Sequence, residues 1–260
     1  MKNTLVKARK YIANTPESGV LLALVLIMGV TQLINPHFLS AANMTSMLKS
    51  IPFIALATLG ASFCLITQNV DISIGRVAGL VGMVFGYILT HGGNLPLAIL
   101  GGLGVGLLVG VINGVLVVHV GVSSFIATMG TLYISGGLRF LINKATAMTL
   151  PESYRTFSQA TPLGISWFFW IVVAIYVIVG FVQRKTVYGR QLYAVGSNID
   201  VAKLQGVNTK WVQFSAYLIS GLCAAIAGIM ATIDISSAQP ATGTAWEFKA
   251  VAACFVGGTS

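Results

Sequence analysis

The chain has 260 residues, of which 56% are hydrophobic and 8% charged, whereas soluble domains carry roughly 25% charged residues. A chain with this small a share of charged residues cannot cover its surface with polar groups. The composition therefore predicts a protein with most of its surface in lipid. The 15 Lys and Arg exceed the 6 Asp and Glu. Most of them gather in two clusters beside apolar stretches, which is typical of cytoplasmic loops and not of a nucleic-acid-binding face.

Eight apolar stretches follow one another along the chain, most of them close to the roughly 20 residues that a helix needs to cross a membrane. We therefore predict an all-α bundle of about eight transmembrane helices, with residues 1–18 as an N-terminal segment and 19–260 as one transmembrane domain. The predicted spans are 19–34, 51–67, 72–89, 95–118, 122–141, 164–182, 211–233 and a last stretch that starts at Phe248.

The two basic clusters predict the topology. The first lies in residues 1–10 and the second in 183–210. With the N-terminus in the cytoplasm, counting the crossings also places 183–210 there, so the second cluster supports the orientation independently of the first. The same count puts residues 35–50, 91–94, 143–162 and 234–246 on the outer face.

Glycine recurs at every fourth position inside several predicted spans. Rows of small residues let helix backbones approach closely in lipid. We expect general close packing of helices, with a specific dimerisation motif as the alternative. The positions are Gly75, Gly79, Gly82, Gly86, Gly102, Gly106 and Gly110.

The stretch QNVDISIG, residues 68–75, places Asp71 between two predicted spans. In one interpretation, Asp71 or Asn69 accepts backbone N–H bonds at the start of the next helix. In the other, Asp71 pairs with Arg76 or belongs to a polar patch along the route of a hydroxylated solute, because a lone deep acid costs roughly 2.5 to 3.5 kcal/mol. The two interpretations are compatible.

The basic segment 188–211 contains a short predicted helix bracketed by Asn198 and Gly206, residues suited to its two ends. Within it Asp200, Ala202 and Gly206 fit the pattern E-A-A-x-x-x-G, with Asp in the acidic place. On spacing alone a solvated connector is the simpler interpretation of this segment.

Four segments in chain order resemble the permease subunits of bacterial ATP-binding-cassette (ABC) sugar importers of the ribose, xylose, galactose and autoinducer-2 type. This group belongs to the branched-chain amino acid and ribose permease superfamily, and the resemblance covers nearly the whole chain. The segments are INPHFLSAANM (34–44), ITQNVDISIG (66–75), GRQLYAVGSNIDVAKLQGV (189–207) and TGTAWEFKAVAACFVGGTS (242–260).

The resemblance implies a multi-pass protein of the bacterial inner membrane that moves a sugar or sugar-like solute by alternating access. Its implied partners are a cytoplasmic ATPase, an external sugar-binding protein and a second permease copy, identical or different, and no cofactor is implied. Asp200, Ala202 and Gly206 would lie in a coupling helix that docks on the ATPase. The chain is not expected to be an enzyme, since it lacks a G-x-x-x-x-G-K-[ST] motif for holding ATP phosphates.

The resemblance also makes Asp71, Ser73 and Gly75 the family's D-[LI]-S-[VI]-G turn and makes Glu247 the acid before the final helices. These four residues are the candidates for the turn or the solute path. The chain departs from the family pattern in two places, and the departures leave the exact solute open. They are Lys249, where an acid is common, and Gln68-Asn69, in place of Gly-Gly or Gly-Asn.

Two other functions are alternatives to the importer. An intramembrane enzyme would need paired acids or a histidine cluster, but His37, His91 and His119 are scattered. A proton-coupled secondary transporter would need acids deep inside several helices, and only Asp71 and Asp234 are candidates.

The last stretch, from Phe248 to Ser260, has 13 residues, fewer than the roughly 20 needed for a span. The resembling permeases continue from a similar Gly-Gly-x-Ser turn into further helices. We therefore expect a chain truncated from about ten spans that inserts into the membrane but does not transport, with a complete short protein as the alternative.

Overall fold

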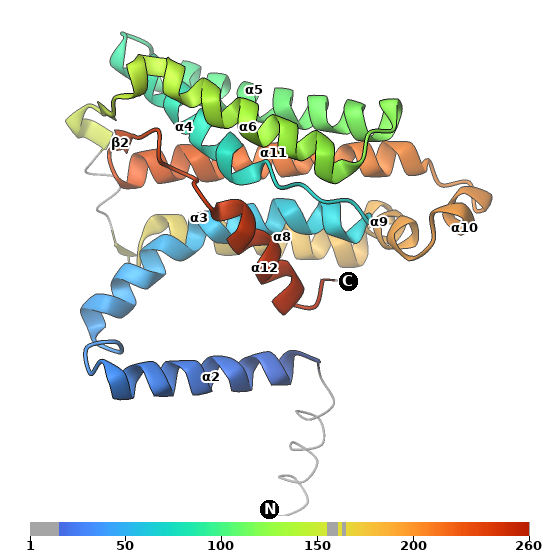
Figure 1. Ribbon diagram of the computed structural model, residues 1–260, viewed down its shortest axis with the longest axis horizontal. Coiled ribbons are helices and arrows are strands. Elements are labelled where there is room, and N and C mark those ends of the chain that lie inside the picture. Colours follow the sequence, from blue (N-terminus) through green and yellow to red (C-terminus); the bar gives the residue numbers. More distant parts are fainter. Residues whose placement is uncertain (1–15, 155–160, 163–164, 260) are drawn as a thin grey trace, which may run out of the picture.

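The computed structural model describes residues 16–154, 161–162 and 165–259. Within them, each predicted apolar stretch overlaps one of the main α-helices, which confirms an all-α polytopic bundle (Figure 1). The predicted N-terminal segment 1–18 lies mostly outside the described residues, as do parts of the predicted outer loop 143–162. The main helices are α2 (Pro16–Ile34), α3 (Ala41–Ile66), α4 (Ile74–Thr90), α5 (Leu95–Gly114), α6 (Ser124–Leu141), α8 (Trp167–Lys185), α11 (Thr209–Asp234) and α12 (Trp246–Val256).

Five helices among the described residues are long and apolar enough to cross a membrane: α3, α5, α6, α8 and α11. Helix α4 is shorter, with 17 residues. Helix α12 has 11 residues, a rise of about 16 Å, which is less than the roughly 30 Å of the hydrocarbon core. The shorter elements are η1 (Val115–Val120), η2 (Ile142–Ala145), α9 (Val187–Ser197), α10 (Ile199–Leu204), β1 (Met148–Thr149) and β2 (Ser237–Ala238).

Helix α3 begins ten residues before the predicted span, at Ala41. Ser40 caps its start, because its hydroxyl accepts the N–H of Asn43 at 3.4 Å. The added turns are polar and mostly exposed, while the half after Pro52 is apolar and mostly buried. Apolar content therefore marks only the packed part of this helix, whereas the helix itself starts at its cap.

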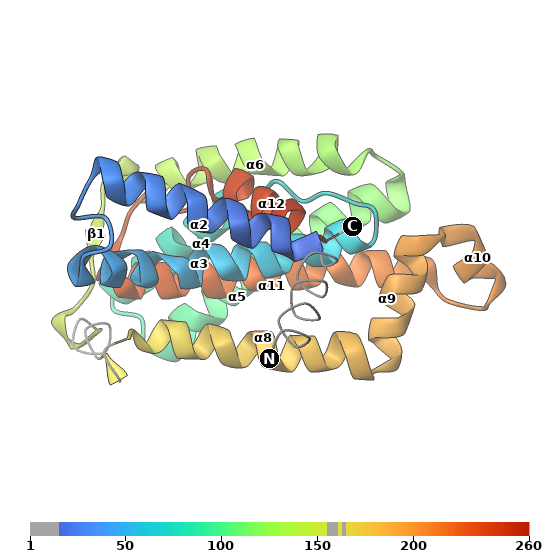
Figure 2. The same cartoon turned by 90° about the horizontal axis from the view of Figure 1, so that it is seen from below.

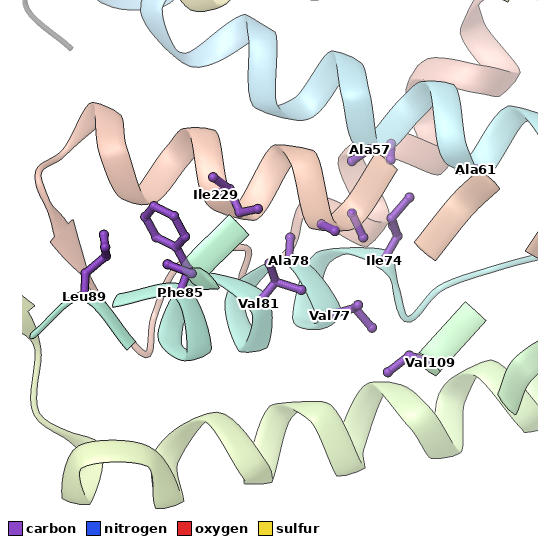
Figure 3. Packing of buried hydrophobic residues seen from close by; sticks show 14 of the residues in the cluster. Ala57, Ala61, Ile74, Val77, Ala78, Val81, Phe85, Leu89, Val109 and Ile229 are labelled. Carbon is purple, nitrogen blue, oxygen red and sulfur yellow. The ribbon is translucent and has the colours of Figure 1, made fainter. Parts of the chain in front are cut away.

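Helix α11 is the centre of the bundle. Its most apolar stretch is 72% buried within the protein, against 11% for α8, so α11 forms the core while α8 presents most of its surface outward. Figure 3 shows how α4 contributes to this core: Val77, Val81 and Phe85 lie on successive turns, and Ile229 of α11 lies across from them.

The glycine row of α5 lies against α11. A Cβ on Gly106 would come within 2.5 Å of the Gly221 carbonyl oxygen, and one on Gly110 within 2.7 Å of the Tyr217 carbonyl oxygen. The expected close packing is therefore confirmed for this row. Its partner is a helix of the same chain, which leaves no room for a dimerisation motif on this face.

The connections gather at two opposite ends of the bundle (Figures 1 and 2). At one end β1 pairs antiparallel with β2, with Met148 opposite Ala238, and so joins two loops that the sequence predicts on the outer face. At the other end lie α9 and α10, from the segment predicted in the cytoplasm. We call these the β1–β2 end and the α9–α10 end.

Candidate functional site

The link between α3 and α4, residues 67–73, is not helical although it is mostly buried in the bundle. Irregular backbone inside a membrane bundle must find hydrogen-bond partners within the protein. Two come from α6: the Val70 N–H donates to Ser124 Oγ at 3.3 Å, and the Ile72 N–H donates to Thr128 Oγ1 at 3.4 Å. Helix α6 therefore holds the middle of this break in place.

Asp71 is buried and accepts three hydrogen bonds. Its Oδ1 accepts the Ser73 N–H at 2.9 Å and the Ser73 hydroxyl at 2.6 Å, and its Oδ2 accepts the Ser220 hydroxyl at 2.6 Å. The short O–H···O distances are typical of hydroxyls that donate to a carboxylate. One carboxylate thus orders the backbone just before α4, which begins at Ile74, and ties that point to α11.

The hydrogen bonds continue from Ser73 into α5 and α6. Asn113 Nδ2 donates to Ser73 Oγ at 3.0 Å, and Thr131 Oγ1 donates to Asn113 Oδ1 at 2.8 Å. The sequence interpretation did not identify Asn113, Thr131 or Ser220. A signal did exist for Asn113, since it is the only amide or charged side chain in α5. We call the set Asp71, Ser73, Asn113, Thr131 and Ser220 the Asp71 cluster.

The space beside the Asp71 cluster is small. The gap lined by Asp71, Ser73, Asn113 and Ser220 has no room for even a water molecule. Pockets for small-molecule ligands measure roughly 300 to 1,000 Å³. In this conformation the cluster is therefore closed to a solute the size of a sugar.

Arg76 does not pair with Asp71, which corrects the pairing predicted from the sequence and leaves the alternative of a polar patch open. Its guanidinium Nε lies 3.6 Å from Oε1 of Glu247, a buried acid in the first turn of α12. The first turn of a helix favours negative charge, so Glu247 is placed where its charge is stabilised twice, by the helix and by Arg76. The structure thus separates the two predicted acids into different clusters.

A second arginine, Arg139 of α6, holds the chain just before α12. Its Nη1 donates to the Thr242 carbonyl oxygen at 2.9 Å and its Nη2 to Thr244 Oγ1 at 3.2 Å. A Cβ on Gly75 or Gly79 would collide with this segment. The predicted glycine at position 75 is therefore needed for the close approach of residues 242–247 to α4.

The predicted coupling residues lie together at the α9–α10 end of the bundle, where Figure 1 shows α10. Helix α10 starts after Asn198, whose Oδ1 accepts the N–H groups of Asp200 and Val201 at 3.0 and 3.1 Å. It is followed by Gly206 at φ 81°. The short helix bracketed by these two residues is thus confirmed.

The side chains of α10 divide into an anchor and an exposed face. Ala202 is buried against the bundle, whereas Leu204 is 88% exposed and Asp200 is exposed beside Lys203. Leu204 and Asp200 therefore belong to the face of α10 that does not pack on the bundle.

Comparisons with known proteins agree with these observations. Residues 43–260 match the model of the family described as branched-chain amino acid transport system / permease component. The autoinducer 2 import system permease protein LsrC of Escherichia coli is 33% identical over 96% of this chain and 74% of its own length. The LsrC proteins of Salmonella choleraesuis and Photorhabdus luminescens are 34% and 32% identical over the same share of this chain and over 73% and 76% of their own lengths. No solved structure matches the chain.

The fold and the comparisons define a multi-pass transport protein of the inner membrane, the permease subunit of an ABC importer. Such a subunit is not an enzyme, because a separate subunit hydrolyses ATP. The chain belongs to the family of branched-chain amino acid transport system permease components.

Proposed function

We propose that this permease subunit imports a sugar-like solute of the autoinducer-2 class, and that a cytoplasmic ATPase drives it through α10. The observation that carries the proposal is the similarity to LsrC permeases over 96% of the chain. The polar side chains of the Asp71 cluster fit a route for a hydroxylated solute, since hydroxyl and amide groups can exchange hydrogen bonds with it.

The ATPase would dock at the α9–α10 end. Asp200 and Leu204 offer a charged and an apolar contact there, Ala202 anchors the helix to the bundle, and Gly206 ends it. The external binding protein would deliver solute at the β1–β2 end. A second permease copy, identical or different, would complete the path. This arrangement places residues 1–18 and 183–210 on the cytoplasmic side and 143–162 outside.

Alternating access gives the closed Asp71 cluster a role. In this conformation the break between α3 and α4 is tied to α6 and α11, and the gap beside Asp71 is too small for the solute. Movement of α10 against the ATPase would open and close this region, as rigid elements shift between two packed arrangements.

Uptake in reconstituted vesicles tests the proposal. The chain is combined with its ATPase and its binding protein, and labelled autoinducer 2 is supplied outside. We expect uptake that requires ATP and stops with a catalytically inactive ATPase. The assay is run with the 260-residue chain and with its reading frame extended downstream, because the truncation expected from the sequence would leave this uptake to the extended form.

Two results would contradict the proposal in different ways. Uptake driven by a proton gradient without the ATPase would refute the coupling. ATP-dependent uptake of ribose but not of autoinducer 2 would leave the coupling intact and refute the solute class.

A further inference from the structure

Gln68 is the second residue of the break between α3 and α4, and its backbone conformation is unusual. Its φ is 60°, in the left-handed region that glycine occupies readily and other residues rarely. A residue held there persists only when its surroundings determine the conformation, and such positions cluster at functional sites.

The side chain of Gln68 makes the contact that holds it. Its Nε2 donates to the carbonyl oxygen of Gly196 at 2.6 Å, in the last turn of α9 and two residues before Asn198, which caps α10. Gly196 also lies directly against the backbone of α3, because a Cβ on it would collide with the Ile66 carbonyl oxygen. The end of α3 and the end of α9 are therefore joined by backbone packing and by one side-chain hydrogen bond.

The same short segment leads to the Asp71 cluster. Only two residues separate Gln68 from Asp71, whose carboxylate binds Ser73 at the start of α4 and Ser220 in α11. Both views of the fold show this link starting beside α9 and running to the start of α4 (Figures 1 and 2). Because the connecting chain is this short, a shift of the last turn of α9 that moves Gln68 also moves Asp71.

We propose that Gln68 is a positioning residue that transmits movement of α9 and α10 to the Asp71 cluster through its hydrogen bond to Gly196. The inference rests on the proposed docking of the ATPase at α10 and adds the route by which docking reaches the buried polar residues. Coupling between distant sites can be carried by contiguous packed and hydrogen-bonded groups, and residues 67–73 connect α9 to the Asp71 cluster in this way.

The test uses two substitutions that remove the donor in different ways. Gln68→Glu keeps the size of the side chain but replaces the amide donor by an acceptor. Gln68→Gly removes the side chain and suits the backbone conformation. Ser236→Gly is the matched control, because Ser236 also has a left-handed φ, 51°, and lies next to β2 at the opposite end of the bundle.

Amide hydrogen exchange is measured on the permease in lipid nanodiscs, with and without the ATPase held in its ATP-bound state. In the wild type and in Ser236→Gly, exchange should change both in α10 and in residues 67–73. In both Gln68 variants the change in α10 should persist, and the change in 67–73 should fall at least fivefold. The thermal unfolding temperature of Gln68→Gly should match that of the wild type, because glycine adopts the left-handed φ of position 68 without strain.

The outcomes separate the inference from the proposed function. A response of residues 67–73 that persists in both Gln68 variants overturns the inference and leaves the docking site standing. If α10 is not protected in the wild type, the docking site is wrong, and the role of Gln68 fails with it. Solute transported per ATP in vesicles gives a second readout: a fall of threefold or more in both Gln68 variants supports transmission, and an unchanged ratio refutes it.

Discussion

At the scale of single residues, Asp71 has the clearest role. Its position between two spans predicted that it orders the start of a helix, and the structure shows its carboxylate accepting the Ser73 N–H. Asp71 also accepts a hydrogen bond from Ser220, which lies 149 positions further along the chain. No local pattern contains that contact, because only the packing of α4 against α11 brings the two side chains together.

Replacing Asp71 separates the hydrogen bonds from the charge. Asp71→Asn keeps an oxygen for the Ser73 N–H, and the Ser220 hydroxyl can turn to accept from the new amide. Asp71→Leu leaves buried donors on both serines unpaired, at about 1 to 3 kcal/mol for each. We expect Leu to lower the thermal unfolding temperature and uptake clearly more than Asn. Equal and complete loss of uptake in both variants, at normal membrane levels, would instead show that the charge is essential.

At the scale of helices, the contact between α5 and α11 depends on the absence of side chains. Gly104 and Gly106 lie two residues apart on α5, but a Cβ on Gly104 would meet nothing within 4 Å, whereas one on Gly106 would meet the Gly221 carbonyl oxygen and the Ala225 side chain. The four-residue spacing of glycines predicted close packing. Which helix it packs against was decided by the arrangement of the bundle.

This pair of glycines gives a matched stability test. Gly106→Ala should push α5 away from α11 and destabilise the fold by about 1 to 3 kcal/mol, the usual cost of overpacking. Gly104→Ala should be neutral or slightly stabilising, since alanine favours helix by up to about 1 kcal/mol. Thermal unfolding in detergent measures both. Equal stability of the two variants would show that this contact does not hold the helices together.

Helix α10 allows a similar comparison for coupling. Gly206 and Gly92 have left-handed φ values of 81° and 85°, and a Cβ on either would meet nothing within 4 Å. Gly206→Glu and Gly92→Glu therefore carry the same backbone strain of about 1 to 2 kcal/mol, but only Gly206 borders the proposed ATPase contact.

We expect Gly206→Glu to reduce uptake and ATPase binding at least tenfold while the protein still inserts into the membrane. Gly92→Glu should keep at least half of the wild-type uptake. We measure how strongly the purified ATPase binds each variant in nanodiscs. Immunoblots give the amount of each variant in the membrane. Near-normal ATPase binding by Gly206→Glu would remove α10 from the coupling contact.

At the scale of the whole molecule, the two ends of the bundle carry different groups of loops. The β1–β2 end joins two segments that the sequence predicts outside, and the α9–α10 end carries the basic segment predicted in the cytoplasm. Agreement between loops far apart in the chain supports the topology, but which end faces the cytoplasm is still a prediction.

Labelling of single cysteines in intact cells tests this orientation. The native residues Cys64, Cys223 and Cys254 are buried and free, and they are replaced first. A reagent that cannot cross the membrane should then label Gln239→Cys, which is exposed next to β2, and should not label Lys203→Cys, which is exposed on α10. Both sites should react once the cells are opened. Labelling of Lys203→Cys in intact cells would reverse the topology.

The sequence by itself determined the class of this protein, the approximate places of its main apolar helices, and the short helix between Asn198 and Gly206. These features follow from local properties: apolar length sets a span, and caps and left-handed glycines set helix ends. Family motifs added the permease function. All of this information lies within short windows of the chain.

Only the tertiary structure decided which residues meet. It paired Arg76 with Glu247 instead of Asp71, brought Ser220 and Asn113 to the Asp71 cluster, and placed Gln68 against α9. Each of these contacts joins residues that lie at least 40 positions apart in the chain. Their partners depend on how helices rotate and cross in the packed bundle, where close approach of small residues and burial of polar groups must be satisfied together.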